Sequence, residues 1–381
     1  MKKALLVFPE YYDATTTSRR VLQASNSIFD EIQISYWARQ GVRDDKGEEI
    51  FKNVIKNPFL REAPPRNIKG IIIFFSFQIW IFKEAMKFKP SFISGFTFYT
   101  ILPILIYKFL FDWKCKVVYD PRDYVSVCYK GGQLKLFILK LIDNVFMALA
   151  DLVIFPDYQY FIHYGLFKLN SKKYYVLPNS TEDSFEKIKT IDIYEKYKIS
   201  KEKMLIPILG YFNEDRGKEL IFKIIKENPE GFHFIVAGDI GNIGDIQFFK
   251  SKENVSFLGK IPYFDALAIM YNATIVPQLY DPLLLNNKYA YPTKFYDCLM
   301  VGTPLIFSTG QTALLDVLNL YNIGISIDYN DTDAFRNVLL KIRENKYDFD
   351  KEVIRSIFVE KYNYEIFRKG LKEKYLSIMN S

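Results

Sequence analysis

The chain has 381 residues, a hydrophobic content of 49% and a formal net charge of +7 at pH 7. This length suits two domains with full cores better than one. Three widely spaced cysteines and two histidines exclude a disulfide scaffold and a histidine-rich metal site. No apolar stretch reaches the roughly 20 residues of a membrane-spanning helix. We therefore expect a cytoplasmic protein that is soluble or peripheral on a membrane.

The positive charge is confined to the first half of the chain. Residues 1–185 contain 25 Lys and Arg against 18 Asp and Glu, whereas the remaining residues are balanced. A basic half suits an anionic membrane surface, a diphosphate-bearing acceptor or nucleic acid. No basic tract is dense enough to favour nucleic acid, and a mildly basic surface without a partner remains an alternative.

The chain opens with a strand–helix–strand pattern. Residues 5–8 form an apolar run typical of a buried strand, residues 18–30 have helical periodicity, and residues 32–38 predict a second strand. Arg19 and Arg20 stand at the start of that helix. They either bind an anionic acceptor or are ordinary surface arginines.

The next segments change from polar to strongly apolar. Residues 41–69 predict a polar loop, 71–87 a helix, 93–96 a strand and 98–111 a second helix. The aromatic side chains of the first of these helices either contact lipid or belong to an interior helix, and the pattern leaves both open.

A charged cluster follows the strand predicted at residues 116–119. The sequence there is VVYDPRDY, which places Arg122 and Asp123 directly after the strand, where α/β sheets carry their sites. The two residues either act on a substrate or form a structural salt bridge. A polar stretch at residues 184–203 is the predicted linker to a second domain.

The second half begins with a layout typical of phosphate binding. An apolar run at residues 205–209 is followed by Gly210, a polar loop, Arg216 and Lys218, and then a helix. A glycine turn with cations at a helix start offers backbone N–H groups and positive charge to a phosphate.

The most informative stretch is residues 291–308, which read YPTKFYDCLMVGTPLIFS. Thr293 follows a proline and predicts a hydroxyl-capped helix start, and Gly302 predicts a left-handed helix end. Residues 305–307 then predict a buried strand. On the helix, Asp297 either accepts hydrogen bonds from two vicinal hydroxyls, as a ribose offers, or is a solvated surface acid.

The string PTKFYDCLMVGTPLI resembles the donor-site signature of family-4-like GT-B glycosyltransferases. The VVYDPRDY segment and the stretch from residue 205 to Lys218 are similar to further segments of that family. The resemblance implies catalytic roles for Arg122 and Asp123, and its opening segment implies acceptor binding by Arg19 and Arg20. The donor-binding residues that the resemblance implies are Asp297 on the ribose, and Lys294, Arg216, Lys218, Gly210, Thr293, Thr309, Gly310 and Asn287.

By this resemblance the fold is α/β of the GT-B type, with two Rossmann-like doubly wound domains facing across a cleft. The expected bounds are 1–185 for an acceptor-binding domain, 204–350 for a donor-binding domain, and 351–381 for helices that cross back to the first. The implied reaction moves a sugar from a nucleoside-diphosphate sugar, with retention and without a metal. The basic first half favours a lipid-diphosphate-linked oligosaccharide as acceptor, in bacterial surface-polysaccharide biosynthesis.

One departure from the family pattern concerns an acidic residue. Many members carry two glutamates eight positions apart, whereas this chain has Tyr289 and Asp297 at those places. The change leaves Asn286 or Asn287 to contact the transferred sugar. Three other functions stay open: a catalytically silent GT-B partner subunit, a non-hydrolysing nucleotide-sugar 2-epimerase, and a carbohydrate-binding or scaffold protein.

Overall fold

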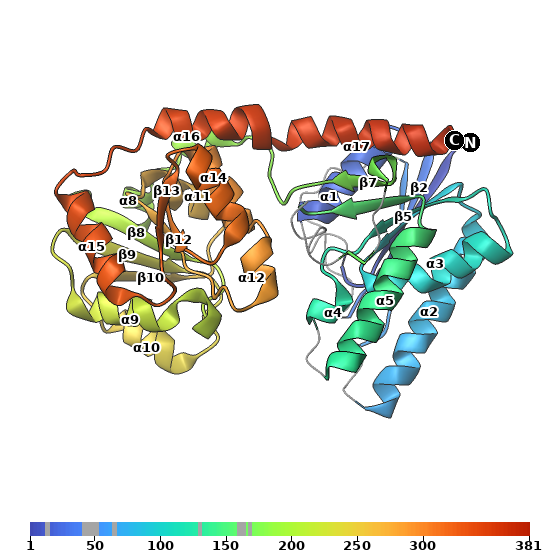
Figure 1. The fold of residues 1–381 in the computed structure, drawn as a ribbon, viewed down its shortest axis with the longest axis horizontal. Helices are drawn as coiled ribbons and strands as arrows, with labels where there is room; N and C mark the ends of the chain where they lie inside the picture. The colour runs from blue at the N-terminus through green and yellow to red at the C-terminus, as the bar shows by residue number, and fades with distance from the viewer. Residues whose placement is uncertain (12–15, 40–52, 63–66, 129–131, 158–164, 167–169) are drawn as a thin grey trace. The chain divides into compact units, whose positions relative to one another are not determined.

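The chain folds as two compact units. The first consists of Met1–Pro178 and Glu365–Ser381, and the second of Asn179–Tyr364. The computed structural model describes residues 1–11, 16–39, 53–62, 67–128, 132–157, 165–166 and 170–381 (Figure 1). The segment predicted at 351–381 is divided between the units, because its residues up to Tyr364 belong to the second.

The first unit is built on one parallel sheet of seven strands, in the order β3-β2-β1-β4-β5-β6-β7. The strands are β1 (Lys3–Phe8), β2 (Glu31–Trp37), β3 (Val54–Phe59), β4 (Phe92–Phe96), β5 (Lys116–Asp120), β6 (Leu152–Phe155) and β7 (Tyr174–Val176). The helices are α1 (Thr16–Asn26), α2 (Ile68–Phe88), α3 (Phe98–Leu110), α4 (Val125–Cys128), α5 (Gln133–Leu149), η1 (Ser171–Lys173) and α17 (Tyr364–Met379). The central strands are near-continuous apolar runs because helices cover both faces of a parallel sheet.

Strand β3 occupies part of the segment predicted to be a loop, and that prediction is wrong there. The strand pairs in parallel with β2, with Ile32 opposite Val54. Its polar residues and Pro58 hide the strand pattern. An edge strand tolerates a proline because one side of its backbone pairs with no neighbour.

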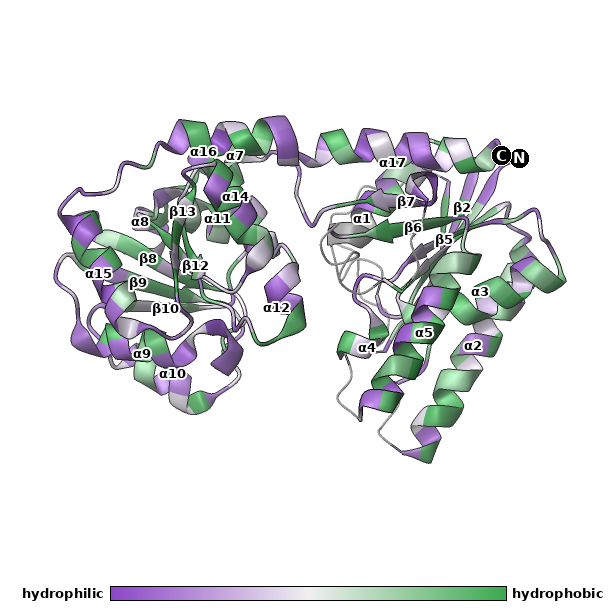
Figure 2. Ribbon diagram, viewed as in Figure 1, coloured by the Kyte–Doolittle hydropathy of each residue, from purple (hydrophilic) through white to green (hydrophobic). Residues whose placement is uncertain are grey.

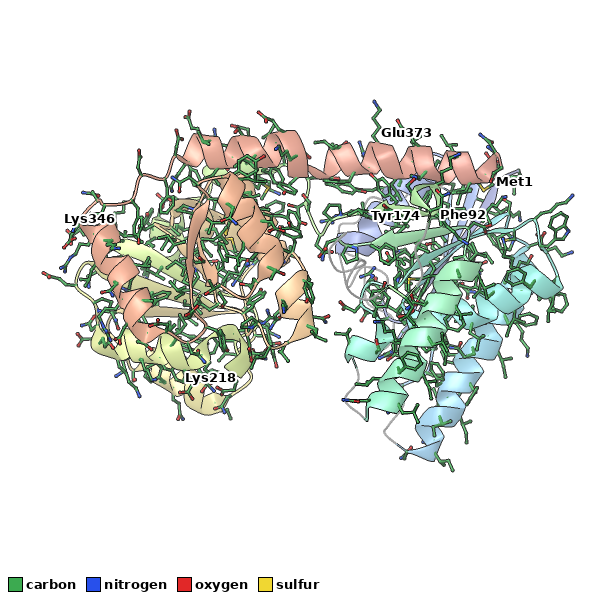
Figure 3. All side chains as sticks on the ribbon, in the orientation of Figure 1. Met1, Phe92, Tyr174, Lys218, Lys346 and Glu373 are labelled. Atoms are coloured by element: carbon green, nitrogen blue, oxygen red, sulfur yellow. The ribbon has the colours of Figure 1, made fainter. Side chains whose placement is uncertain are left out.

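The C-terminal helix α17 packs on the first unit. Tyr375 is fully buried, and its ring centroid lies 4.9 Å from that of Phe92 on β4. The hydroxyl of Tyr175 donates to the carbonyl oxygen of Phe367 at 2.8 Å. Figure 3 shows Glu373 pointing outward from α17, whereas Tyr375 on the same helix is buried, so α17 has one buried face and one exposed face.

The second unit contains two parallel three-stranded sheets, in the orders β10-β9-β8 and β11-β12-β13. The strands are β8 (Met204–Leu209), β9 (Phe232–Ala237), β10 (Val255–Gly259), β11 (Val276–Gln278), β12 (Leu305–Ser308) and β13 (Gly324–Ile327). The helices are α7 (Phe185–Lys189), α8 (Ile193–Tyr197), η2 (Glu214–Arg216), α9 (Lys218–Glu227), α10 (Ile243–Lys250), α11 (Tyr263–Asn272), α12 (Leu285–Tyr289), α13 (Thr293–Val301), α14 (Thr312–Leu320), α15 (Thr332–Arg343), α16 (Lys351–Ile357) and η3 (Phe358–Tyr362).

The inner strands β8 and β11 lie next to each other. The backbone N–H of Thr274, just before β11, donates to the carbonyl oxygen of Leu205 on β8 at 3.0 Å. Strands β9 and β10 therefore follow β8 on one side, and strands β12 and β13 follow β11 on the opposite side. In α/β sheets the loops diverge at such a reversal and leave a crevice beyond the carboxyl ends of the strands.

Helices α7 and α8 occupy half of the predicted linker at 184–203, and the whole segment is part of the second unit. Ile188 and Ile193 are fully buried in its core. The polar majority of the segment conceals these apolar positions in the sequence.

Helix α13 ends as predicted, at Gly302 with φ +73°. Its start differs from the prediction. Pro292 occupies the cap position and no side chain caps the helix, because Thr293 is already its first helical residue. Among the residues that the structure describes, no helix is both long enough and apolar enough to cross a bilayer.

The cap at Gly302 yields a stability prediction. A Cβ there would lie 2.4 Å from the carbonyl oxygen of Lys351, in a backbone conformation that L-residues avoid. We expect Gly302→Ala to destabilise the second unit by about 1–3 kcal/mol, measured as a lower midpoint in differential scanning calorimetry. Gly241→Ala is the control, since its Cβ would meet nothing within 4 Å. Equal midpoints for the two variants would contradict the prediction.

Candidate functional site

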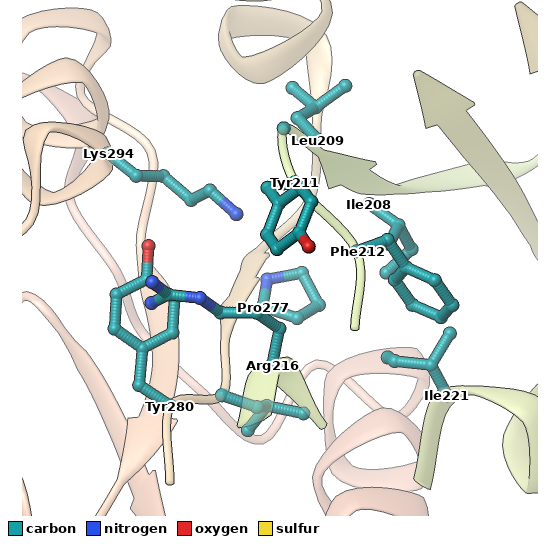
Figure 4. A pocket seen from close by; sticks show the side chains of 11 residues that line it. Ile208, Leu209, Tyr211, Phe212, Arg216, Ile221, Pro277, Tyr280 and Lys294 are labelled. Carbon is teal, nitrogen blue, oxygen red and sulfur yellow. The ribbon is translucent and has the colours of Figure 1, made fainter. Parts of the chain in front are cut away.

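A pocket opens in the second unit at the carboxyl ends of β8 and β11, where the strand order reverses. Its walls come from the turn after β8, from η2, from the loop after β11 and from the first turn of α13. The lining residues are Ile208, Leu209, Gly210, Tyr211, Phe212, Arg216, Ile221, Pro277, Leu279, Tyr280 and Lys294 (Figure 4).

The turn after β8 depends on two glycines. Gly210 and Gly238 have φ values of +96° and +138°. A Cβ on Gly238 would lie 2.0 Å from the carbonyl oxygen of Gly210, so the turns after β8 and β9 pack backbone against backbone. The N–H of Gly210 donates to Ala237 at 2.9 Å, and that of Asp239 donates back to Gly210 at 3.2 Å. These contacts fix the wall of the pocket that Gly210 provides.

Arg216 reaches the pocket from the end of η2. Its Cζ lies 3.7 Å from the ring centroid of Tyr280, a cation–π contact that orients the guanidinium. Its Nη1 is buried and has no hydrogen-bond partner among the described residues. A buried charged donor without an acceptor costs free energy. An anion in the pocket would supply that acceptor.

Lys294 approaches the same space from α13, and Figure 4 shows its ammonium pointing toward Tyr211 and the Arg216 side. The pKa of Lys294 is lowered to about 8, chiefly by burial and also by the positive charge of Arg216, whereas Cys298 and Asp297 act in the opposite direction. Among the described ion pairs, none includes Arg216 or Lys294. The pocket thus holds two cations whose charge no carboxylate neutralises directly.

Asp297 lies one turn beyond Lys294 on α13. It is 4% exposed, and its Oδ1 accepts a hydrogen bond of 2.6 Å from the hydroxyl of Tyr263, the first residue of α11. Tyr263 could not be predicted as the partner of Asp297, because the two residues are 34 positions apart. Asp297 is therefore a buried carboxylate that a hydrogen bond orients, and not a solvated surface acid.

Thr309 and Gly310 lie in the turn after β12. The hydroxyl of Thr309 donates to the carboxylate of Asp328. A Cβ on Gly310 would lie 2.2 Å from the Cβ of Pro282, so this glycine lets the loop after β11 pack against the turn. Neither residue lines the pocket.

Lys218 and Asn287 also lie outside the pocket lining. The ammonium of Lys218 pairs with Asp245 at 2.8 Å and with Glu214 at 3.2 Å. The hydrogen bond with Asp245 raises the pKa of Lys218. Asn287 is 7% exposed and donates to the carbonyl oxygen of Asp281 at 3.0 Å. Both residues hold the framework around the pocket in place.

Three polar residues that the sequence did not single out are fully buried at the ends of β11 and β12. They are Gln278, Ser308 and Gln311, each with side-chain nitrogen or oxygen atoms that no hydrogen bond satisfies within the described part of the chain. Buried amides and hydroxyls of this kind are usually hydrogen-bonded. Their common location marks this edge of the sheet as unusually polar.

In the first unit, Arg122 and Asp123 follow β5 as predicted. Arg122 has φ +58°, its N–H donates to Asp120 Oδ1 at 3.2 Å, and its Cζ lies 5.3 Å from the ring of Phe96. Burial raises the pKa of Asp120 to about 6, while Arg122 opposes that rise. Asp123 is exposed.

Arg20 is largely inside the first unit. It is 4% exposed, and its Nη1 donates to the carbonyl oxygen of Pro178 at 2.8 Å. This contact ties α1 to the segment after β7. Arg19 also belongs to α1, but its side chain lies outside the described part of the structure.

The structure thus groups the predicted residues into two sets. Gly210, Arg216 and Lys294 line one pocket of the second unit, with Asp297 one turn away. Arg122 and Asp123 lie together at a strand end of the first unit.

Comparisons with known proteins agree on the fold. No protein-family model matches the chain. An uncharacterized 41.2 kDa protein in the cps region of Klebsiella pneumoniae is 20% identical over 295 residues, covering 76% of this chain and 77% of that protein.

Solved structures match over nearly the whole length of the chain. Sucrose-phosphate synthase from Thermosynechococcus elongatus has a TM-score of 0.73 at 13% identity and covers 100% of both chains. Anabaena HepE in complex with UDP has a TM-score of 0.69 at 14% identity, covering 99% of this chain and 100% of that one. The chain has the GT-B fold that the sequence predicts.

The Tyr263–Asp297 hydrogen bond yields a second stability prediction. Tyr263→Phe removes the hydroxyl donor from a buried carboxylate, which costs about 1.5–3 kcal/mol when the acceptor is charged. We expect a lower thermal midpoint by circular dichroism. Tyr211→Phe is the matched control because that side chain is 64% exposed. A midpoint for Tyr263→Phe as high as that of the control would refute a stabilising role.

Proposed function

We propose that the chain is a glycosyltransferase that moves a sugar from a nucleoside-diphosphate sugar to a lipid-diphosphate-linked oligosaccharide, in bacterial surface-polysaccharide biosynthesis. The observation that carries this proposal is the convergence of Arg216 and Lys294, without a paired carboxylate, on a pocket at the strand-order reversal. The UDP complex of a protein with the same fold supports a nucleotide ligand. The cps-region relative supports a role in polysaccharide assembly.

In the proposed complex, the diphosphate lies between the two cations. The guanidinium of Arg216 donates to its oxygens from Nη1, and the ammonium of Lys294 adds a second positive charge. Both cations stabilise the negative charge that develops on the leaving diphosphate, which is the role a divalent metal has in other phosphate-leaving reactions. The transfer therefore proceeds without a metal, and excess EDTA leaves it unchanged.

The remaining roles follow from position. Asp297 accepts hydrogen bonds from the two ribose hydroxyls, with Tyr263 holding the carboxylate in place. Arg122 and Asp123 act on the transferred sugar or the acceptor from the end of β5. The basic first half of the chain suits an acceptor that carries a diphosphate and is embedded in the inner face of the plasma membrane. The configuration of the sugar is retained.

Donor binding is the first test. We expect one member of a panel of UDP-, GDP-, dTDP-, ADP- and CMP-linked sugars to raise the thermal midpoint. Arg216→Ala should weaken that donor by about 10- to 100-fold, since it removes a hydrogen bond to a charged group worth about 1.5–3 kcal/mol. Arg343→Ala is the control, because this arginine pairs with Glu230 on the surface of the same unit.

The outcomes separate the competing functions. A donor that binds and is consumed only when acceptor is added supports the transferase. Conversion of the donor alone would instead identify a 2-epimerase, and binding without turnover on any acceptor would identify a silent subunit. Absence of binding by every donor would refute the proposed site.

The pKa of Lys294 makes donor affinity depend on pH. Below about 8 its ammonium is charged and attracts the diphosphate, whereas above about 8 the empty site loses the proton and part of the attraction. Affinity should therefore fall as pH rises from 7 to 9, by at most about tenfold per pH unit for one linked proton. Isothermal titration calorimetry across this range measures the slope.

Lys294→Arg provides the control for this slope. A guanidinium stays charged throughout the range, so the variant should bind the donor with little change between pH 7 and pH 9. Any titration of the ligand itself affects both proteins equally. The same decline in both would show that Lys294 is not the titrating group.

A further inference from the structure

Helices α2, α3 and α5 lie side by side on one face of the seven-stranded sheet (Figure 1). They belong to the successive crossovers from β3 to β6, which run in one direction and are right-handed. The amide of Gln78 on α2 donates to the carbonyl oxygen of Tyr99 on α3 at 2.7 Å. The rings of Phe98 on α3 and Phe146 on α5 are 5.5 Å apart. The outward side of these helices is called the three-helix face below.

Helix α2 is apolar on both of its long sides. Its inner side contains Phe77, Ile81 and Ala85, which are fully buried. Its outer side contains a second apolar row at the helical spacing of three and four residues. The members of this row are Ile68, Ile71, Ile72, Phe75 and Ile79, with exposures of 77%, 55%, 61%, 59% and 56%.

Helix α5 has polar residues inside and apolar residues outside. Asp143 and Asn144 are buried, and Asp143 accepts hydrogen bonds from the hydroxyl of Tyr119 and the N–H of Val125. The opposite side repeats apolar residues at helical spacing. They are Leu134, Phe137, Ile138, Leu141, Val145 and Leu149, exposed between 39% and 74%. A helix that meets only water on its outer side has the reverse arrangement.

Helix α3 completes the face between the other two. Leu102, Ile106, Phe109 and Leu110 form its outer row, and Trp113 follows the helix with 74% exposure. Figure 2 shows hydrophobic colour over most of the length of all three helices. Soluble monomers rarely expose contiguous apolar patches larger than a few hundred Å². Three adjacent outward rows of exposed apolar side chains form such a patch, which favours a partner other than water.

The exposed charges on these three helices are all positive. Every exposed charged side chain of α2, α3 and α5 is a lysine, namely Lys69, Lys83, Lys87 and Lys135. Of the two acids, Asp143 is buried, and Glu84 accepts hydrogen bonds from the side-chain amides of Gln33 and Asn57. The face is therefore apolar with a basic border.

We infer that the three-helix face docks on the surface of an anionic lipid bilayer, with its apolar rows in the acyl boundary and its lysines at the lipid phosphates. Interfacial helices combine such rows with lysines on flexible stems, and tryptophans such as Trp113 favour the headgroup level. A second copy of the chain fits less well, because a two-fold contact sets the same lysines against each other. The inference goes beyond the proposed sugar transfer and does not depend on it.

Vesicle binding by the full chain, without any nucleotide, tests the inference. We expect the protein to float with vesicles of phosphatidylcholine and phosphatidylglycerol, and more weakly with phosphatidylcholine alone. The triple variant Ile72→Gln, Phe75→Gln and Phe137→Gln should lose at least tenfold in vesicle affinity. Its matched control replaces Ile243, Leu320 and Val353 of the second unit, also more than half exposed, with glutamine.

A second variant tests the electrostatic contribution to vesicle binding. Lys69→Glu combined with Lys135→Glu should reduce binding to the anionic vesicles, and added salt should reduce the binding of the wild type. Equal vesicle binding by the face variant and its control would overturn the inference. So would a stable dimer in analytical ultracentrifugation that the face variant dissociates, because the occupant would then be a second copy.

The result of the vesicle-binding experiment can be distinguished from the result of the donor-binding experiment. The substitutions on the three-helix face are in the first unit, and the donor pocket is in the second. Unchanged thermal midpoints show that the variants fold, and unchanged thermal shifts with the bound donor show that the pocket is intact. Loss of vesicle binding with donor binding retained supports the docking face alone.

Discussion

The reversal of strand order between β8 and β11 is the constraint on which the site in the second unit depends. Crossovers in a parallel sheet are right-handed, so the helices on the two sides of the reversal leave toward opposite faces. The carboxyl ends of β8 and β11 then remain uncovered. The neighbouring turns close there because Gly238 has no side chain: a Cβ on it would lie 2.0 Å from the carbonyl oxygen of Gly210. A side chain at Gly238 would therefore move the pocket wall.

Two cations share the resulting pocket, and their proximity is unfavourable while it is empty. Arg216 keeps its charge at any physiological pH, and burial, together with that charge, lowers the pKa of Lys294 to about 8. The buried Nη1 of Arg216 adds an unsatisfied donor. The proposed diphosphate would relieve the repulsion, the buried charge and the missing hydrogen bond together. These features of the pocket are the physical reason for proposing an anion there.

Local features could be predicted from the sequence where a backbone conformation or a burial pattern admits only a few residue types. Gly302 could be assigned to a helix end because few residues tolerate that conformation. The apolar runs predicted several of the parallel strands, and the resemblance of residues 292–306 to the donor-site signature implied the fold. Contacts between distant residues carried no such signal. Tyr263 meets Asp297 only after folding, and Lys218 is adjacent in sequence to the Arg216 turn but pairs with Asp245.

Helix α5 shows why periodicity could not reveal the docking face. Its apolar residues have helical spacing and the helix is Gln133–Leu149, but a period does not state which side faces the sheet. Tyr119 and Val125 decide this, because both donate to Asp143 and draw the polar side inward. The apolar row is then left outside. An exposed apolar row is favourable at the surface of an anionic bilayer, which is partly apolar. The same surface would attract the excess positive charge of the first half of the chain.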